Sequence, residues 1–215
     1  MKFSEYNVNQ FLEDLSSTSP SPGGGSAAGL VAALAGCLNS MVYSLTTNKK
    51  AFEALDNDVK KTVLDFMEAS NKFTKKAMNL MEKDRDCFNK LMDCYKLPKD
   101  TEEQKVEREK SIKEATLKAL MAPLELAGEC YEFYDNIDIA VKYGNKMLLS
   151  DASCAAILLH AAIESAIVNV KVNLNSLRNQ PFAKKIEEEI DDLMFNSFSR
   201  KNIISNMVDE VIYPE

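Results

Sequence analysis

The sequence is poor in the residues that metal sites and nucleophilic triads need. It has a single histidine, His160, and its five cysteines include no C-x-x-C pair. One histidine excludes multi-histidine metal sites and makes a Ser-His-Asp triad a poor candidate, so we expect no metal. An odd number of scattered cysteines, with no secretory signal before them, favours a reduced, cytoplasmic protein.

The sequence also lacks any concentration of positive charge. Its net charge is −7, and its 26 lysines and arginines are spread along the chain. This distribution argues against a nucleic-acid surface, although a local basic patch could still hold an anionic small molecule.

Strand-like patterns are missing as well, because no segment alternates steadily between polar and apolar residues. Apolar residues recur at helical spacing, which predicts an all-α fold. Long helices joined by short loops indicate an antiparallel bundle, which we expect to form one domain over residues 1–215. The expected helices cover about residues 5–15, 27–46, 57–95, 101–141, 152–177 and 181–211. Thr101 is the expected N-cap of the fourth of these helices, and Pro123 is expected to kink it.

The second expected helix is almost apolar and long enough to suggest a membrane span. Asn39 and Ser40 interrupt it, and no basic flank precedes it. We therefore expect a buried helix of a bundle and no membrane contact. Its small residues Ala28, Ala32 and Gly36 lie four apart, so another helix can approach closely as core or as a subunit contact.

Glycine is scarce, yet four of the seven glycines lie between Gly23 and Gly29. They follow two prolines and surround Ser26, which occupies the expected N-cap of the second helix. The segment is either a flexible connector or an anion site at a helix N-terminus. It is neither a phosphate loop nor a dinucleotide fingerprint, because no Gly-Lys-Ser/Thr follows and no strand precedes it.

One acidic residue breaks the apolar face of the third helix. Asp84 shares this face with apolar, small and aromatic residues, whereas Asp86 points about 200° away at 3.6 residues per turn. A carboxylate on such a face is costly unless it is paired or functional. Asp84 therefore either forms a salt bridge with a neighbouring helix or serves a pocket.

The fifth helix carries a neutral polar stripe that includes Asn169 and Asn173. Amide side chains at this spacing can read the edge of a heterocycle or can form a network between helices. Ser150 and Asp151 precede this helix and read as an ordinary N-cap. For His160, which lies in an apolar run of the same helix, we expect a structural role.

Four ordered motifs together resemble a known family. Residues 19–28 are similar to its S-P-x-P-G-G-G-S-x-A signature, and residues 84–88 with 95–101 to its D-x-x-A-F and LPK-x-T block. Residues 150–151 and 169–174 are similar to its S-D and N-V-x-I-N-L blocks. The resemblance covers about residues 1–178 and points to the cyclodeaminase/cyclohydrolase family of folate enzymes. Cys87 stands where that family usually has alanine.

This resemblance implies an all-helical homodimer acting on a tetrahydrofolate derivative, which can be polyglutamylated, with no further cofactor. The favoured reaction is the cyclisation of 5-formiminotetrahydrofolate to 5,10-methenyltetrahydrofolate with release of ammonia. The alternative is a cyclohydrolase that interconverts the methenyl form and 10-formyltetrahydrofolate. From another class, the long helices also suit a non-catalytic dimerisation module.

The resemblance and the residue patterns together assign roles to particular side chains. Asp84 is the expected catalytic group, because ring closure needs a proton taken from N10 and one given to ammonia. Asn169 and Asn173 are expected to contact the pterin, and the glycine segment to hold the substrate, with its glutamate carboxylates as one candidate. The expected substrate-binding residues are Gly23, Gly24, Gly25, Ser26, Phe88, Asp151, Asn169 and Asn173.

Overall fold

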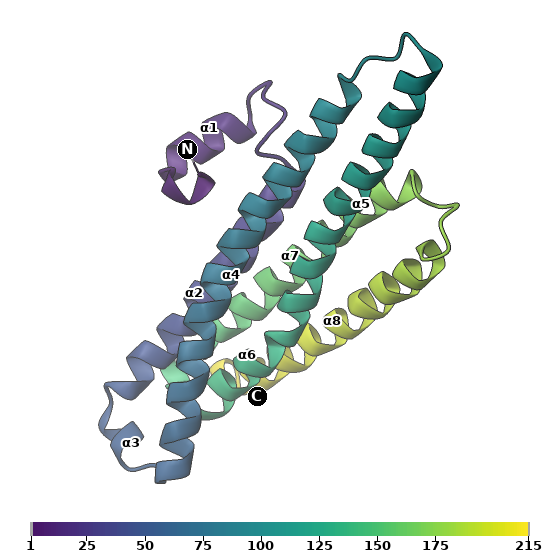
Figure 1. The fold of residues 1–215 in the computed structure, drawn as a ribbon. Coiled ribbons are helices and arrows are strands. Elements are labelled where there is room, and N and C mark those ends of the chain that lie inside the picture. Colours follow the sequence, from purple (N-terminus) through teal and green to yellow (C-terminus); the bar gives the residue numbers. More distant parts are fainter. Residues whose placement is uncertain (1, 215) are drawn as a thin grey trace.

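The protein folds as a bundle of long helices. The structure, a computed structural model, describes residues 2–214, and within that range every regular element is a helix, which confirms the all-α prediction (Figure 1). The elements in chain order are η1 (Phe3–Glu5), α1 (Val8–Leu15), α2 (Gly24–Thr47), α3 (Lys50–Glu53), α4 (Asn57–Tyr95), α5 (Glu102–Glu132), α6 (Tyr134–Tyr143), η2 (Lys146–Leu148), α7 (Leu149–Asn175) and α8 (Ala183–Ile212).

Helices α2, α4, α5 and α7 form the centre of the bundle. α4 and α5 run antiparallel as a long hairpin, α2 packs against α4 and α7, and α5 also contacts α7 (Figure 1). α8 lies on α7. The N-terminal elements attach at one end of α4, where Phe3 and Phe11 pack around Met81. The expected antiparallel arrangement is therefore present.

The small residues of α2 let this helix approach α4 closely, as their spacing predicts. A Cβ built on Gly29 would lie 2.7 Å from the Cβ of Met81, and one on Gly36 would overlap Thr74. Ala28 and Ala32 are buried in the main core. This close contact fixes the register of α2 against α4, and so determines which α4 residue meets the start of α2.

A buried polar network joins α2, α4 and α6 near the other end of the bundle. The Asn39 amide donates to the side chain of Asn136 at 2.7 Å, and Asn136 donates to the Phe66 carbonyl at 2.8 Å. The predicted helix over 101–141 is in fact two helices, α5 and α6, which meet at Phe133. The break accompanies the inward turn of Asn136 and the stacking of Phe133 on Phe73. Pro123 lies inside α5 without ending it.

Two predicted N-caps are wrong, and one is confirmed. The side chain of Thr101 accepts from the Gln104 backbone and caps α5 as expected. α2, however, begins at Gly24 with Gly23 as its N-cap, so Ser26 lies inside the first turn. α7 begins at Leu149, directly after η2, so Ser150 and Asp151 lie in its first turn and do not cap it. Gly24 and Gly25, the first two residues of α2, have neighbours too close for a side chain to fit easily.

Two helical segments are long and apolar enough to cross a membrane by length and composition alone, α2 and the stretch from Lys146 to Asn175. Core helices of soluble bundles meet the same criterion. The apolar windows of these helices are 50% and 44% buried inside the bundle. One side of each helix packs in the core, while the other side leaves apolar residues on the surface.

Candidate active site

Asp84 is a partly buried carboxylate without a cation beside it. It lies on α4 opposite the first turn of α2, and the Ser26 hydroxyl donates to its Oδ2 at 3.5 Å. Among residues 2–214 it forms no ion pair, so the structure does not support the salt-bridge reading. Burial raises the pKa of Asp84 to about 6, and the hydrogen bond from Ser26 opposes that shift. Such a carboxyl can exchange a proton near neutral pH.

The first turn of α2 is shaped to receive this carboxylate. A Cβ on Gly25 would overlap both carboxylate oxygens of Asp84. A Cβ on Gly24 would lie 3.3 Å from the Asn169 Nδ2, whereas one on Gly23 would meet nothing within 4 Å. Gly24 and Gly25 therefore bring α2 against side chains of α4 and α7.

Asn169 lies on α7 next to Gly24 of α2, and Asn173 lies one turn further along α7. Their NH₂ groups are engaged by the protein, because Asn169 donates to the Ser165 carbonyl at 2.8 Å and Asn173 to the Ala119 carbonyl at 3.1 Å. Asn173 also donates to the Asn169 carbonyl at 3.0 Å. Within the described chain their side-chain oxygens accept no hydrogen bond, so each amide can still accept one from the N–H groups of a heterocycle.

The structure thus brings together most of the predicted site. Gly24, Gly25 and Ser26 from α2 meet Asp84 from α4 and Asn169 from α7, with Asn173 one turn further along. Gly23 is the adjoining N-cap of α2.

The two remaining predicted residues differ in their placement. Phe88 lies one turn beyond Asp84 on α4 and is half-buried. Asp151 precedes Asn169 by 18 residues of the same helix, which places it about 27 Å away at 1.5 Å per residue. Within one chain, Asp151 therefore lies away from Asp84, and its role in substrate binding stays a prediction.

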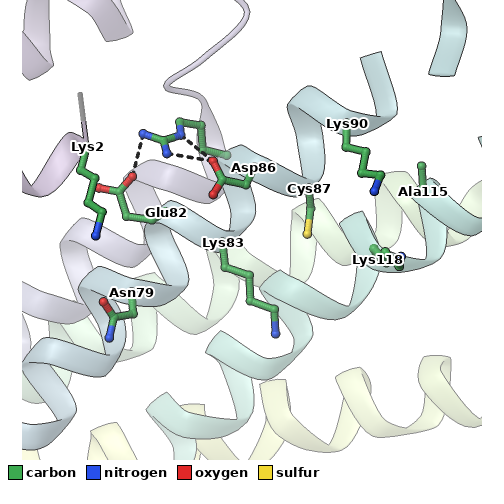
Figure 2. A pocket seen from close by; sticks show the side chains of 10 residues that line it. Lys2, Asn79, Glu82, Lys83, Asp86, Cys87, Lys90, Ala115 and Lys118 are labelled. Atoms are coloured by element: carbon green, nitrogen blue, oxygen red, sulfur yellow. Dashed lines mark hydrogen bonds and ion pairs between the residues drawn. The ribbon is translucent and has the colours of Figure 1, made fainter. Parts of the chain in front are cut away.

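Beside the site lies a basic cavity that sequence reasoning missed. It has a volume of about 410 Å³ and lies between α4 and α5 (Figure 2). Lys83 and Lys90 line it from α4, and Lys118 lines it from α5. The seven-residue spacing of Lys83 and Lys90 on one helical face was the available signal, but the contribution of α5 emerges only in the folded chain.

The acidic and soft side chains do not gather into a metal centre. In residues 2–214, no group of three or more His, Cys, Asp or Glu side chains is placed to hold a metal ion. His160 lies between α7 and α8, with its Nδ1 2.8 Å from the Ser197 hydroxyl, in keeping with a structural role.

Comparison with solved structures identifies the class of protein that this fold and site define. The crystal structure of formiminotetrahydrofolate cyclodeaminase from Thermotoga maritima superimposes with a TM-score of 0.84. The match covers 98% of this chain and 99% of that protein, at 25% sequence identity. The shared architecture is that of an all-helical cyclodeaminase.

Sequence comparison then names the family. Residues 7–192 match the formiminotransferase-cyclodeaminase family, so the chain belongs to it. A methenyltetrahydrofolate cyclohydrolase from Methylorubrum extorquens is 34% identical over 87% of this chain and 88% of its own length. The formimidoyltransferase-cyclodeaminase from Rattus norvegicus is 30% identical over 87% of this chain, which spans only 34% of that relative. The family expected from the four motifs is thereby confirmed.

Proposed function

We propose that this chain is a folate one-carbon enzyme that cyclises 5-formiminotetrahydrofolate to 5,10-methenyltetrahydrofolate and releases ammonia. The observation that carries the proposal is Asp84, a carboxyl without a cation partner that faces the start of α2 and has a pKa near 6. A group with this pKa can both take and return a proton at neutral pH, which this ring closure requires.

The chemistry follows from that placement. N10 attacks the carbon of the protonated formimino group and forms a tetrahedral centre between N5 and N10. Asp84 accepts the N10 proton and passes it to the departing nitrogen, which leaves as ammonia. The methenyl product is an amidinium cation, and the ionised carboxylate beside it stabilises the developing charge. Protons and charge balance, because one cation gives another cation and neutral ammonia.

In this proposal, the side-chain amides of Asn169 and Asn173 on α7 orient the pterin of the substrate. The side-chain oxygens of Asn169 and Asn173 can accept from N–H groups of the pterin, since their own NH₂ groups are already held by backbone carbonyls. Amides held in this way need little reordering when the ligand arrives. In this proposal the folate is the substrate, carrying one or more glutamates, and no further cofactor takes part.

A second function is supported by a specific observation. The cyclohydrolase relative is matched over 88% of its length, whereas the bifunctional relatives are about three times longer than the matched segment. In a cyclohydrolase, Asp84 would deprotonate the water that attacks the methenyl carbon and would give that proton to N5 as the bond between N5 and the carbon breaks. The remaining hydroxyl proton would leave to solvent as the formyl C=O forms, so the methenyl cation and water give neutral 10-formyl product and one proton.

One experiment decides between these reactions. The purified chain is given 5-formiminotetrahydrofolate or 5,10-methenyltetrahydrofolate in separate assays, and ammonia and 10-formyltetrahydrofolate are measured. Ammonia release supports the cyclodeaminase, and 10-formyl product from the methenyl form supports the cyclohydrolase. A non-catalytic dimerisation module would give neither product, and a reduced folate would not raise its melting temperature.

We also propose that the enzyme is a homodimer that pairs through an apolar surface of α2 and α7. This α2–α7 face consists of exposed residues at helical spacing on the two helices, which pack side by side. Exposed apolar surface of this kind marks an interaction site. Its largest members are Leu34, Met41, Leu45, Ile157, Val168 and Val172.

Pairing through this face would also account for Asp151. If two copies pack antiparallel about a two-fold axis near Ala161, the start of α7 in one copy would lie beside the Asn169 end of α7 in the other. We further propose a cytoplasmic location, where the five free thiols stay reduced.

A further inference from the structure

Half of the residues that line the cavity between α4 and α5 are basic (Figure 2). Five of its lining residues are basic and two are acidic, in a chain whose net charge is −7. The local charge is thus opposite to that of the whole molecule. The basic residues are Lys2, Lys83, Arg85, Lys90 and Lys118, and the acidic residues are Glu82 and Asp86.

The two acidic residues of the cavity are paired with one of its cations. Arg85 lies 2.7 Å from Glu82 and 2.8 Å from Asp86, so these three side chains together carry one net negative charge. Lys83 lies 2.6 Å from Glu125, outside the cavity lining. Within residues 2–214, the ammonium groups of the other three lysines, Lys2, Lys90 and Lys118, form no ion pair. The cavity can therefore accept anionic groups.

Residues on either side of Asp84 in the sequence line the cavity. Lys83 precedes Asp84 directly in the sequence. Cys87, one turn after Asp84, lines the cavity and also packs against an apolar cluster between α4 and α5 that contains Leu91, Ala115 and Ala119. The carbonyl of Ala119 accepts the hydrogen bond from Asn173. A ligand whose reacting atoms lie at Asp84 can therefore place a more distant part over Cys87, between Lys90 and Lys118.

The start of α2, by contrast, already faces an anion of the protein. A Cβ on Gly25 would overlap the Asp84 carboxylate, so a substrate carboxylate near Gly25 would lie beside Asp84 and would be repelled by it when both are ionised. A site away from Asp84 avoids this repulsion. In a reduced folate, the two carboxylates of the glutamate lie one p-aminobenzoyl group beyond N10.

We propose that the cavity between α4 and α5 holds the glutamate tail of the folate, with Lys90 and Lys118 as its principal partners and Lys2 and Lys83 at its sides. This assignment rests on the proposed folate substrate and replaces the glycine segment as the carboxylate site. Each further γ-linked glutamate adds a carboxylate to a cavity with several lysines, so longer tails bind more tightly.

The test reverses the two principal charges. The double variant Lys90→Glu, Lys118→Glu is compared with Lys61→Glu, Lys75→Glu, which makes the same charge change at exposed positions of α4 outside the cavity. Substrates with one and with five glutamates are assayed. We expect the cavity variant to raise KM for the five-glutamate substrate about 10-fold, with kcat within about 2-fold, and the control to change neither. A KM equal to that of the control overturns the proposal.

A second measurement separates this inference from the proposed reaction. A γ-linked triglutamate peptide, which lacks the pterin, is titrated against wild type and both variants by calorimetry at low salt. Binding that is lost only in the cavity variant supports the tail site, even if neither folate is turned over. If ammonia is released normally and the peptide does not bind, the tail site is wrong and the proposed function stands.

Discussion

Gly25 and Asp84 approach so closely that no side chain other than hydrogen fits at residue 25. A Cβ there would overlap both oxygens of the Asp84 carboxylate. This contact couples the glycine segment to the candidate catalytic group, across 59 residues of chain. It also explains why α2 begins with glycine, since a helix start with side chains would displace the carboxylate.

That contact predicts different outcomes for two neighbouring glycines. Gly25→Ala forces Asp84 out of place, and we expect kcat to fall by about 10-fold or more, because small misplacements of catalytic groups are costly. Gly23→Ala is the matched control, since a Cβ there meets nothing within 4 Å. Steady-state assays of both variants provide the measurement, and equal activities would contradict the assignment.

The acid limb of the pH profile should belong to Asp84. Its pKa of about 6 means that the base form is lost below pH 6, so kcat/KM should fall about tenfold per pH unit there. Asp84→Asn should lower kcat by about 10² or more and should remove this limb. Asp65→Asn, an exposed change on the same helix, should leave the profile intact. Near-wild-type turnover in Asp84→Asn would exclude Asp84 as the proton carrier.

The same substitution should stabilise the fold. The folded-state pKa of Asp84 is raised from 3.8 to about 6, so its contribution to stability is full below about pH 4 and is lost as the pH rises through 6. At pH 7 the ionised carboxylate costs on the order of 2–3 kcal/mol. Urea unfolding should therefore show Asp84→Asn to be more stable than wild type at pH 7, with the gap closing towards pH 4. A gap that is independent of pH would contradict the raised pKa.

The oligomer proposal makes a separate prediction. Leu34→Glu combined with Val168→Glu places two charges on the α2–α7 face and should convert the dimer to monomer in analytical ultracentrifugation. Leu64→Glu changes a similarly exposed leucine on α4, outside this face, and should remain dimeric. A wild-type protein that sediments as a monomer at micromolar concentration would overturn the proposal.

Most of the fold could be predicted from local sequence patterns, because the spacing of apolar residues along a helix and the capping of its ends involve only a few neighbouring residues. Thr101 caps α5 as its sequence predicts. The break between α5 and α6 at Phe133 could not be predicted from local sequence, since it accompanies the hydrogen bond between Asn136 and Asn39, 97 residues apart. The N-cap assigned to Ser26 failed for a related reason, because the start of α2 packs against Asp84, 59 residues further along the chain. The N-cap assigned to Ser150–Asp151 failed because the helical turn η2 runs directly into α7.

The candidate site likewise combines features that the sequence determines with features that only the tertiary structure determines. The sequence by itself determined which residues are unusual: a carboxylate on an apolar face, amides on an apolar helix and glycines at a helix start. Only the tertiary structure decided that Gly25 receives Asp84 and that Asn169 joins them. It also placed lysines of two helices around one cavity. Distances between helices depend on how closely their faces pack, and no single segment encodes that packing.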